Sequence, residues 1–189
     1  GESVGNAGGI AGYSEGSVSR CVSMMDLVNV SNSYVDFLLN NDIGGIVGDN
    51  KGTVSECLAV GTIEGVEDVG GLVGHNGSVI NNSYAIGSVR GESHVGGLVG
   101  GSNSSGTIMS SYAANTVAGD SLVGGLVGWN DGQVETSYWN TEISGLDTSA
   151  GGTGLSSVKM MKFSSFAGWD TLGYDEYIQV DLDTCDYYQ

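Results

Sequence analysis

Basic residues are scarce in this sequence of 189 residues, which has 5 Lys and Arg against 22 Asp and Glu and a formal net charge of −17. Nucleic-acid binding depends on clustered positive charge, and anionic lipid surfaces repel an acidic protein. We therefore expect no nucleic-acid partner. The sequence also lacks any apolar run of roughly 18 residues, so we expect no membrane insertion. Cationic partners, metal ions and neutral glycans remain compatible with this composition.

Catalytic motifs are missing as well. Histidine occurs only at His75 and His94, without a His-Glu-x-x-His pair, and there is no Gly-x-Ser-x-Gly motif. A serine nucleophile needs a base and a group that orients it, and a zinc site would need scattered carboxylates. The Gly-Gly-Thr-Gly stretch at 151–154 is not followed by the Gly-Lys-Ser/Thr of a phosphate-binding loop. We therefore predict that the chain is not an enzyme, and we interpret both histidines as surface turn residues near different corners of the fold.

Glycine, by contrast, is abundant: the chain has 34 glycines, and a Gly-Gly-(Ile/Leu)-(Ala/Val)-Gly block recurs along it. The copies begin at Gly8, Gly44, Gly70, Gly96 and Gly124, so that consecutive copies are 36, 26, 26 and 28 residues apart. Because glycine is unfavourable inside helices, this composition argues against a mostly helical protein. The longer first interval indicates an inserted loop within residues 24–41.

Each block is followed by further apolar positions at nearly constant intervals. A β-branched residue comes next, at Val18, Val54, Ile80, Ile108 and Val134. A third apolar stretch follows in four copies, at Ile63, Val89, Val117 and Ile143. Each unit of about 26 residues thus has three short apolar pieces separated by Gly, Asn and Ser, a pattern typical of short strands joined by turns.

Stacking such units buries a face that one unit cannot bury alone. The sequence therefore predicts an all-β protein, a parallel β-helix (β-solenoid) of about five coils, with equivalent strands about 4.8 Å apart. The period is too short for a propeller blade of about 40 residues. We assign residues 1–145 to the repeats and residues 146–189 to a C-terminal cap, with a short helix within 155–166 and a closing strand within 169–180.

The repeat alignment also assigns side chains to faces. Tyr84, Tyr112 and Tyr138 share one column, which we predict to face the core, with small residues such as Cys57 and Ala85 on the opposite face. An asparagine follows three blocks at one interval and a fourth block one residue later, at Asn50, Asn76, Asn130 and Asn103. We interpret this column as a hydrogen-bonded ladder that satisfies turn backbone groups.

These blocks resemble the GLUG motif repeats of large bacterial and archaeal surface proteins. The resemblance rests on the glycine blocks, the Gly-x-(Val/Ile) that follows them, and Ser-Tyr-Ala at 83–85 and 111–113, and it covers about residues 5–145. The first copy departs most, because Cys-Val-Ser stands at 21–23 in place of Ser-Tyr-Ala. The resemblance implies a secreted or surface-exposed protein, a fold similar to a right-handed parallel β-helix, and no catalytic residues in the repeats.

Candidate binding residues are acidic or aromatic and lie in the predicted corners of the coils. They are Trp129, Trp139, Glu67, Asp68, Glu92 and Asp120. The carboxylates could form an acidic stripe that attracts calcium or a cationic partner, or they could be ordinary solvated loop charges. We expect no cofactor other than Ca²⁺: Asp181, Asp183 and Asp186 are candidate ligands of this ion, against the alternative of an exposed acidic tail.

Two covalent modifications are also compatible with the sequence. Cys21 and Cys57 fall in the same repeat column, about 5 Å apart on neighbouring strands, and are a candidate disulfide that leaves Cys185 over. Candidate glycosylation sites are the four Asn-x-Ser/Thr sequons at Asn29, Asn76, Asn81 and Asn103.

The sequence thus favours an extracellular, non-catalytic structural or adhesive module at the cell surface. Its expected partners are a cell-surface glycan or protein, or neighbouring copies of itself. Two alternatives stay open: a self-assembling surface filament or sheath subunit, and an accessory domain of a secreted peptidase or glycan-degrading enzyme.

Overall fold

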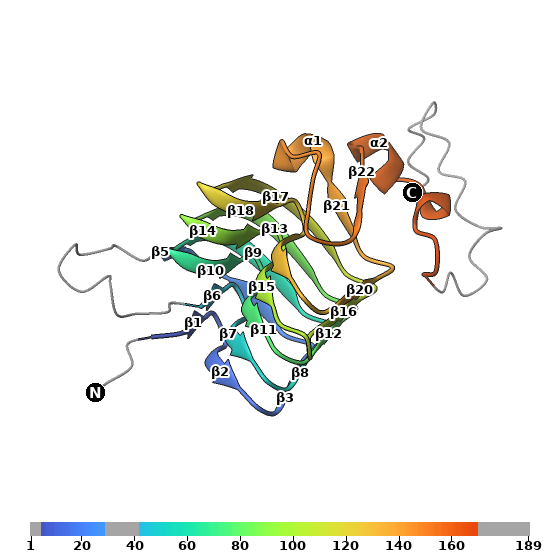
Figure 1. Ribbon diagram of the computed structural model, residues 1–189. Coiled ribbons are helices and arrows are strands. Elements are labelled where there is room, and N and C mark those ends of the chain that lie inside the picture. The colour runs from blue at the N-terminus through green and yellow to red at the C-terminus, as the bar shows by residue number, and fades with distance from the viewer. Residues whose placement is uncertain (1–4, 29–41, 170–189) are drawn as a thin grey trace, which may run out of the picture.

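The computed structural model of the chain describes residues 5–28 and 42–169 (Figure 1). Within these ranges the chain winds through about four turns of a β-solenoid built from four parallel sheets, which confirms the predicted fold class. A complete coil adds one strand to each sheet. The inserted loop of the first interval falls mostly at 29–41, outside the described residues, as does most of the expected closing strand.

The strands of each sheet are stacked in the order in which they occur along the chain. Sheet A contains β1 (Ala7–Gly8), β6 (Ile43–Gly44), β10 (Glu67–Gly70), β14 (Ser93–Gly96) and β18 (Ser121–Gly124). Sheet B contains β2 (Ala11–Ser14), β7 (Val47–Asn50), β11 (Val73–Asn76), β15 (Val99–Ser102) and β19 (Val127–Asn130). Sheet C contains β3 (Ser17–Ser19), β8 (Thr53–Ser55), β12 (Val79–Asn81), β16 (Thr107–Met109) and β20 (Gln133–Glu135). Sheet D contains β4 (Val22–Met24), β9 (Leu58–Glu64), β13 (Tyr84–Arg90), β17 (Tyr112–Ala118), β21 (Tyr138–Asn140) and β22 (Thr153–Leu155), with β5 (Leu27–Val28) also beside β9.

Each coil therefore has four strands rather than the three predicted pieces. The glycine block bends at its Gly-Gly pair, so that one block supplies the end of β10 and the start of β11. The second predicted piece also bends, and its latter half joins the third piece to form the seven-residue strands β9, β13 and β17. Ile143 is the exception among the third pieces: it lies in helix α1 (Thr141–Ser144) and is 41% exposed, not in a strand.

The core runs as columns of identical or similar side chains through the stack. Ile46, Leu72, Leu98 and Leu126, the third residues of the second to fifth blocks, are all completely buried, whereas Ile10 of the first block is 49% exposed. A second cluster, between sheet A and the ends of the long strands of sheet D, is built on Val69, Val95 and Val89. Burying one such side chain contributes about 1.5–3 kcal/mol, so both sets of columns stabilise the stack.

The predicted orientation of sheet D is wrong by one residue. Ala85 and Ala113 are buried, whereas Tyr84 and Tyr112 point outward and are half-buried, with rings stacked at 5.0 Å between centroids. The interior is too narrow for a ring here because the Gly-Gly bend lies directly opposite: a Cβ atom on Gly71 would come within 2.9 Å of the Ala85 Cβ. Small side chains therefore face the core although they are the less hydrophobic set.

Buried serines complete this corner of the coil. Ser83 Oγ accepts a hydrogen bond from the Cys57 amide (3.0 Å) and donates one to the Asn81 carbonyl (2.7 Å). Ser111 Oγ accepts from the Ser83 amide in the same way, at 3.1 Å. The serine column thus links successive coils and satisfies backbone groups that would otherwise be buried without partners.

The asparagine ladder is confirmed at the corner between sheets B and C. Asn50 Nδ2 donates to Asn76 Oδ1 at 2.9 Å, and Asn76 Nδ2 lies 3.5 Å from Ser102 Oγ. Ser102, not Asn103, occupies the column in the fourth coil, since Asn76 pairs with Ser102 in the strand register. Asn130 continues the column and bonds both the amide and the carbonyl of Gly132.

The C-terminal segment covers the last coil. Strand β22 adds to sheet D beside β21, and helix α2 (Ser157–Met160) begins after Ser156, whose hydroxyl accepts from the Lys159 amide as an N-cap. A 3₁₀ turn follows at Phe163–Ser165. Tyr138 is buried beneath Phe166, and its hydroxyl donates to the Ala167 carbonyl at 2.7 Å. No helix of the described residues is long and apolar enough to cross a membrane.

Candidate functional site at the bend between sheets A and B

Two columns of unlike side chains face each other across the Gly-Gly bend between sheets A and B. The first column lies two residues before each block and consists of Asn6, Asp42, Asp68, His94 and Leu122. The second lies five residues after the start of each block and consists of Tyr13, Asp49, His75, Gly101 and Trp129. The buried block between them is nearly constant, so the coils differ mainly in what they present at this bend.

Asp68 lies at the centre of this arrangement, between two imidazole rings. Its Oδ2 atom accepts a hydrogen bond from Nδ1 of His75 at 2.8 Å, in the tautomer that carries the proton there. Its Oδ1 atom lies 2.9 Å from Nδ1 of His94, which belongs to the next coil. The three side chains are only 13%, 20% and 23% exposed, in the order Asp68, His75 and His94. The prediction that the two histidines occupy different corners is therefore wrong: strand stacking brings both to one carboxylate.

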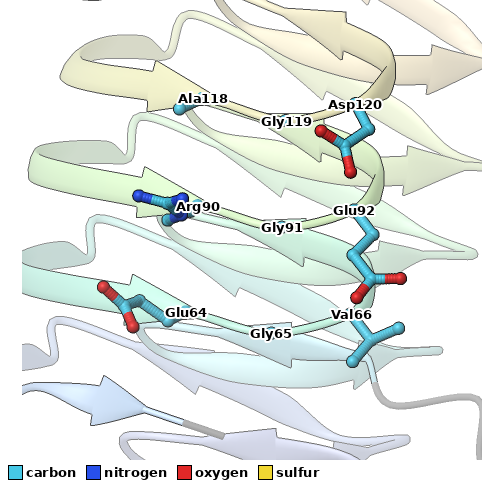
Figure 2. A pocket seen from close by; sticks show the side chains of 9 residues that line it. All are labelled: Glu64, Gly65, Val66, Arg90, Gly91, Glu92, Ala118, Gly119 and Asp120. Atoms are coloured by element: carbon cyan, nitrogen blue, oxygen red, sulfur yellow. The ribbon is translucent and has the colours of Figure 1, made fainter. Parts of the chain in front are cut away.

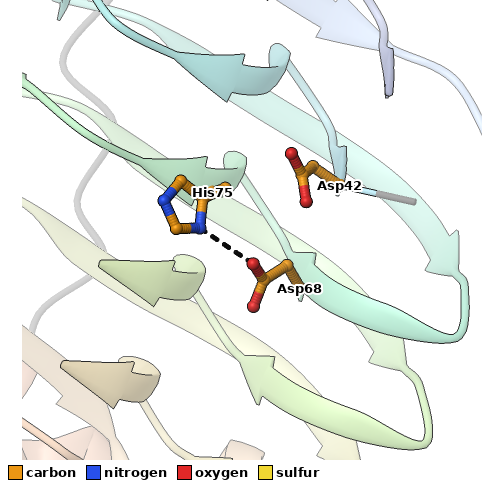
Figure 3. A group of neighbouring side chains, drawn as sticks. All are labelled: Asp42, Asp68 and His75. Atoms are coloured by element: carbon orange, nitrogen blue, oxygen red, sulfur yellow. Dashed lines mark hydrogen bonds and ion pairs between the residues drawn. The ribbon is translucent and has the colours of Figure 1, made fainter. Parts of the chain in front are cut away.

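A second carboxylate, Asp42, joins this group from the preceding coil (Figure 3). Burial, and then the negative charge of Asp68, raises the pKa of Asp42 to about 7. The hydrogen bond with Asp68 raises the pKa of His75 above its usual value, although burial acts in the opposite direction. The group therefore brings two carboxyl groups and an imidazole together in a partly desolvated place.

Neighbouring side chains enclose the group without neutralising it. Lys51 Nζ lies 2.9 Å from Asp49 Oδ1 in the adjacent position of the second column. The Asn103 amide nitrogen lies 3.4 Å from Nε2 of His75, and the Trp129 ring packs against His94 with 5.7 Å between ring centroids. Trp129, a predicted ligand-binding residue, is thus half-buried at the edge of this group.

The predicted acidic stripe divides into two separate places. Asp68 belongs to the histidine group, and Glu67 Oε1 lies 3.7 Å from Nδ1 of His94. Glu92 and Asp120 instead lie one above the other at the turn between sheets D and A, where the Asp120 amide donates to the Glu92 carbonyl. The two glutamates separate because Glu67 is the first residue of β10, whereas Glu92 lies in the turn before β14.

Glu92 and Asp120 line a groove of about 430 Å³ that runs across three coils (Figure 2). Its opposite rim carries Glu64 and Arg90, which are paired in the strand register, and glycines lie between the two rims. Arg90 is the only basic residue in the lining. The groove therefore presents carboxylates to solvent on both sides.

Several other predicted residues are accounted for by packing. Trp139 is 6% exposed and donates from Nε1 to the Leu146 carbonyl at 3.1 Å, so it closes the core rather than forming a platform for a sugar ring. Asn76 is completely buried and its amide belongs to the ladder, so it is not a glycosylation site in the folded coil. Asn81 and Asn103 are half-buried, while Asn29 lies outside the described residues.

The cysteines and the acidic tail complete the account of the predicted residues. Cys21 and Cys57 occupy the same column on adjacent coils, as predicted, and both are free thiols here. Cys57 is buried, and its thiol donates to the Ser55 carbonyl at 3.2 Å. Asp181, Asp183 and Asp186, together with Cys185, lie outside the described residues.

The fold defines a class of protein: a parallel β-solenoid made of short glycine-rich repeats. Within that class, the family model of the GLUG motif matches residues 65–90, which form one complete coil from the turn before β10 to the end of β13. The resemblance seen in the sequence is thereby confirmed for this coil, and the β-solenoid fold is consistent with a GLUG repeat protein. Searches of curated proteins and of solved structures found no match to this chain.

Proposed function

We propose that this chain is an extracellular, non-catalytic structural module whose stack of coils holds a variable outer surface for binding a glycan or a protein. The observation that supports this function is the contrast between inside and outside. The block residues in the core scarcely change from coil to coil, whereas the two columns at the bend between sheets A and B carry acidic, imidazole, aromatic and aliphatic side chains in turn. Repeats that serve only as a spacer would gain nothing from such variety.

The arrangement suits display because each coil is held by hydrogen-bonded ladders in all four sheets. Binding groups on such a frame keep fixed separations, which lowers the entropy lost on binding. Trp129 offers part of its ring beside the histidine group, and Glu92 and Asp120 offer carboxylates in the groove. Both surfaces suit neutral sugars or cationic groups rather than anionic polymers.

The test is a binding screen with the purified 189-residue chain on arrayed neutral glycans, with calcium and with a chelator. Two variants probe the two surfaces: Trp129→Ala, and Glu92→Gln combined with Asp120→Asn. Glu135→Gln, an exposed change in β20 of sheet C, is the matched control. We expect at least one probe variant to weaken a detected interaction by roughly 30-fold, the loss typical of a residue worth about 2 kcal/mol at an interface.

Equal binding by all variants and the control would contradict display by these surfaces, and cleavage of an arrayed glycan would contradict a non-catalytic role. Sedimentation of the same sample over a range of concentrations separates the filament alternative. Reversible end-to-end polymers without any glycan binding would favour that alternative over the proposed one.

A further inference from the structure

The group formed by Asp42, Asp68 and His75 has the composition and spacing of a metal site. Each of these side chains offers one ligand atom, and the three atoms lie within 4.8 Å of one another. Figure 3 shows the three side chains converging from two neighbouring coils. Ligand atoms bound to one zinc ion at about 2.0–2.2 Å lie roughly 3.3–3.6 Å apart in a tetrahedral shell. The 2.8 Å hydrogen bond between His75 and Asp68 would therefore open when the ion binds, while all three atoms stay within their present limit of 4.8 Å.

A second observation points to a missing partner at the same place. Asp68 Oδ1 and His94 Nδ1 are both fully buried, and neither makes a hydrogen bond within the described part of the chain. They approach to 2.9 Å without hydrogen-bond geometry. Buried polar atoms are nearly always satisfied, so this end of the group has unused bonding capacity beside the three candidate ligands.

The charge balance leads to the same conclusion. In the described ranges, neither Asp42 nor Asp68 forms an ion pair with a lysine or arginine, because the nearby Lys51 is paired with Asp49. Two partly buried carboxylates without a permanent cation are costly to the fold. A divalent cation would offset this cost.

The donor set selects the kind of cation. Calcium and magnesium prefer shells made only of oxygen, whereas an imidazole nitrogen together with carboxylate oxygens suits zinc and other divalent transition metals. Three protein ligands leave a fourth position for water or for a partner.

We propose that Asp42, Asp68 and His75 bind one divalent transition-metal ion, zinc being the best fit, with His94 lying beside the second oxygen of Asp68. The ligands come from two successive coils, so the ion ties these coils together on their outer side. The alternative is a purely structural Asp68–His75 pair that binds no metal. This proposal does not depend on glycan or protein binding by the outer surface.

The test measures zinc binding to the purified 189-residue chain after removal of metals with EDTA and dialysis. Competition with a chromogenic chelator gives the affinity, and elemental analysis gives the stoichiometry. We expect one zinc ion per chain to depend on this group, and we expect His75→Gln and Asp42→Asn each to weaken its binding by at least tenfold. Changing a group that merely supports a metal ligand already costs about 10–100-fold.

Two controls identify the binding residues. Glu92→Gln with Asp120→Asn removes two carboxylates from the other corner and should leave zinc binding unchanged. Cobalt substitution reports on the donors, since a site built from these residues should show ligand-field bands without thiolate charge-transfer absorption. A thiolate band would instead place the metal on cysteine and overturn the proposal.

Folding of the variants is checked by circular dichroism, and Asp42→Asn keeps the shape of the side chain it replaces. We expect zinc to raise the melting temperature of the wild-type chain and not that of either ligand variant. Failure of the wild-type chain to bind zinc at stoichiometric ratios would overturn the proposal. So would undiminished binding by both folded variants.

Discussion

The asparagine ladder allows a quantitative test of how the coils are held together. Asn76 lies in the middle of the stack and is completely buried. It accepts from Asn50 at 2.9 Å and from the Ser78 amide at 3.4 Å, and it donates to the Ser78 carbonyl at 3.0 Å and toward Ser102 at 3.5 Å. Replacing it with alanine removes two bonds within its own turn and two bonds to the neighbouring coils.

The expected cost follows from these contacts. A typical hydrogen bond contributes about 1 kcal/mol net, and a buried group left without a partner costs about 1–3 kcal/mol. Asn50 retains a 3.4 Å contact with the Val79 carbonyl, and the 3.5 Å contact is weak, which lowers the total. We therefore expect Asn76→Ala to lower the free energy of unfolding by about 3 kcal/mol.

Asn130 is the matched control because it forms the bonds within its own turn to Gly132, at 3.1 and 3.2 Å, and is only half-buried. We expect Asn130→Ala to cost about 1 kcal/mol. Urea unfolding followed by both circular dichroism and tryptophan fluorescence gives the two values, and agreement of the two probes shows whether a single transition applies. Equal losses in the two variants would show that the bonds between coils contribute nothing, which would refute the reasoning.

Three further experiments probe the packing of the coils. Gly97→Ala places a Cβ atom against the Gly125 carbonyl and should destabilise the fold by at least about 1–3 kcal/mol. Gly16→Ala has open space around it and should leave the stability nearly unchanged, and the urea midpoints of the two variants test this difference. Leu98→Ala should lower the free energy of unfolding by about 2–5 kcal/mol, and Ile86→Ala, whose side chain is 39% exposed on sheet D, should lower it by less than about 1 kcal/mol. The opposite order in thermal melts would favour the face of sheet D predicted from the sequence, with Tyr84 directed to the core. Burial raises the pKa of the Cys57 thiol, so at pH 8 it should react with iodoacetamide far more slowly in the native than in the unfolded chain; peptide mapping without reductant would reveal a disulfide instead.

The repeat was sufficient to predict the solenoid because a fixed period forces equivalent residues onto neighbouring strands. The asparagine ladder was predictable for the same reason. The orientation of sheet D was not, because hydrophobicity alone places Tyr84 inside and Ser83 outside. The structure reverses this choice for two physical reasons: the Gly-Gly bend leaves no room for a ring beside Ala85, and the Ser83 hydroxyl is needed to satisfy the Cys57 amide.

The histidine group was hidden in the sequence by distance along the chain, since Asp68 precedes His75 by seven residues and His94 by 26. The signal was nevertheless present in the alignment. Two positions of each coil lie on opposite sides of the Gly-Gly bend: the one two residues before the block and the one five residues after its start. Their side chains meet across the bend, and the equivalent positions of the next coil lie one strand spacing away. Any coil of this kind that carries an acidic residue at the first position and a histidine at the second should therefore form the same pair. Replacing Asp49 with histidine tests this rule in the present chain, because Asp42 holds the first position of that coil: the new imidazole should pair with Asp42, and zinc affinity should rise relative to the wild-type chain if the column geometry, rather than the particular coil, determines the site.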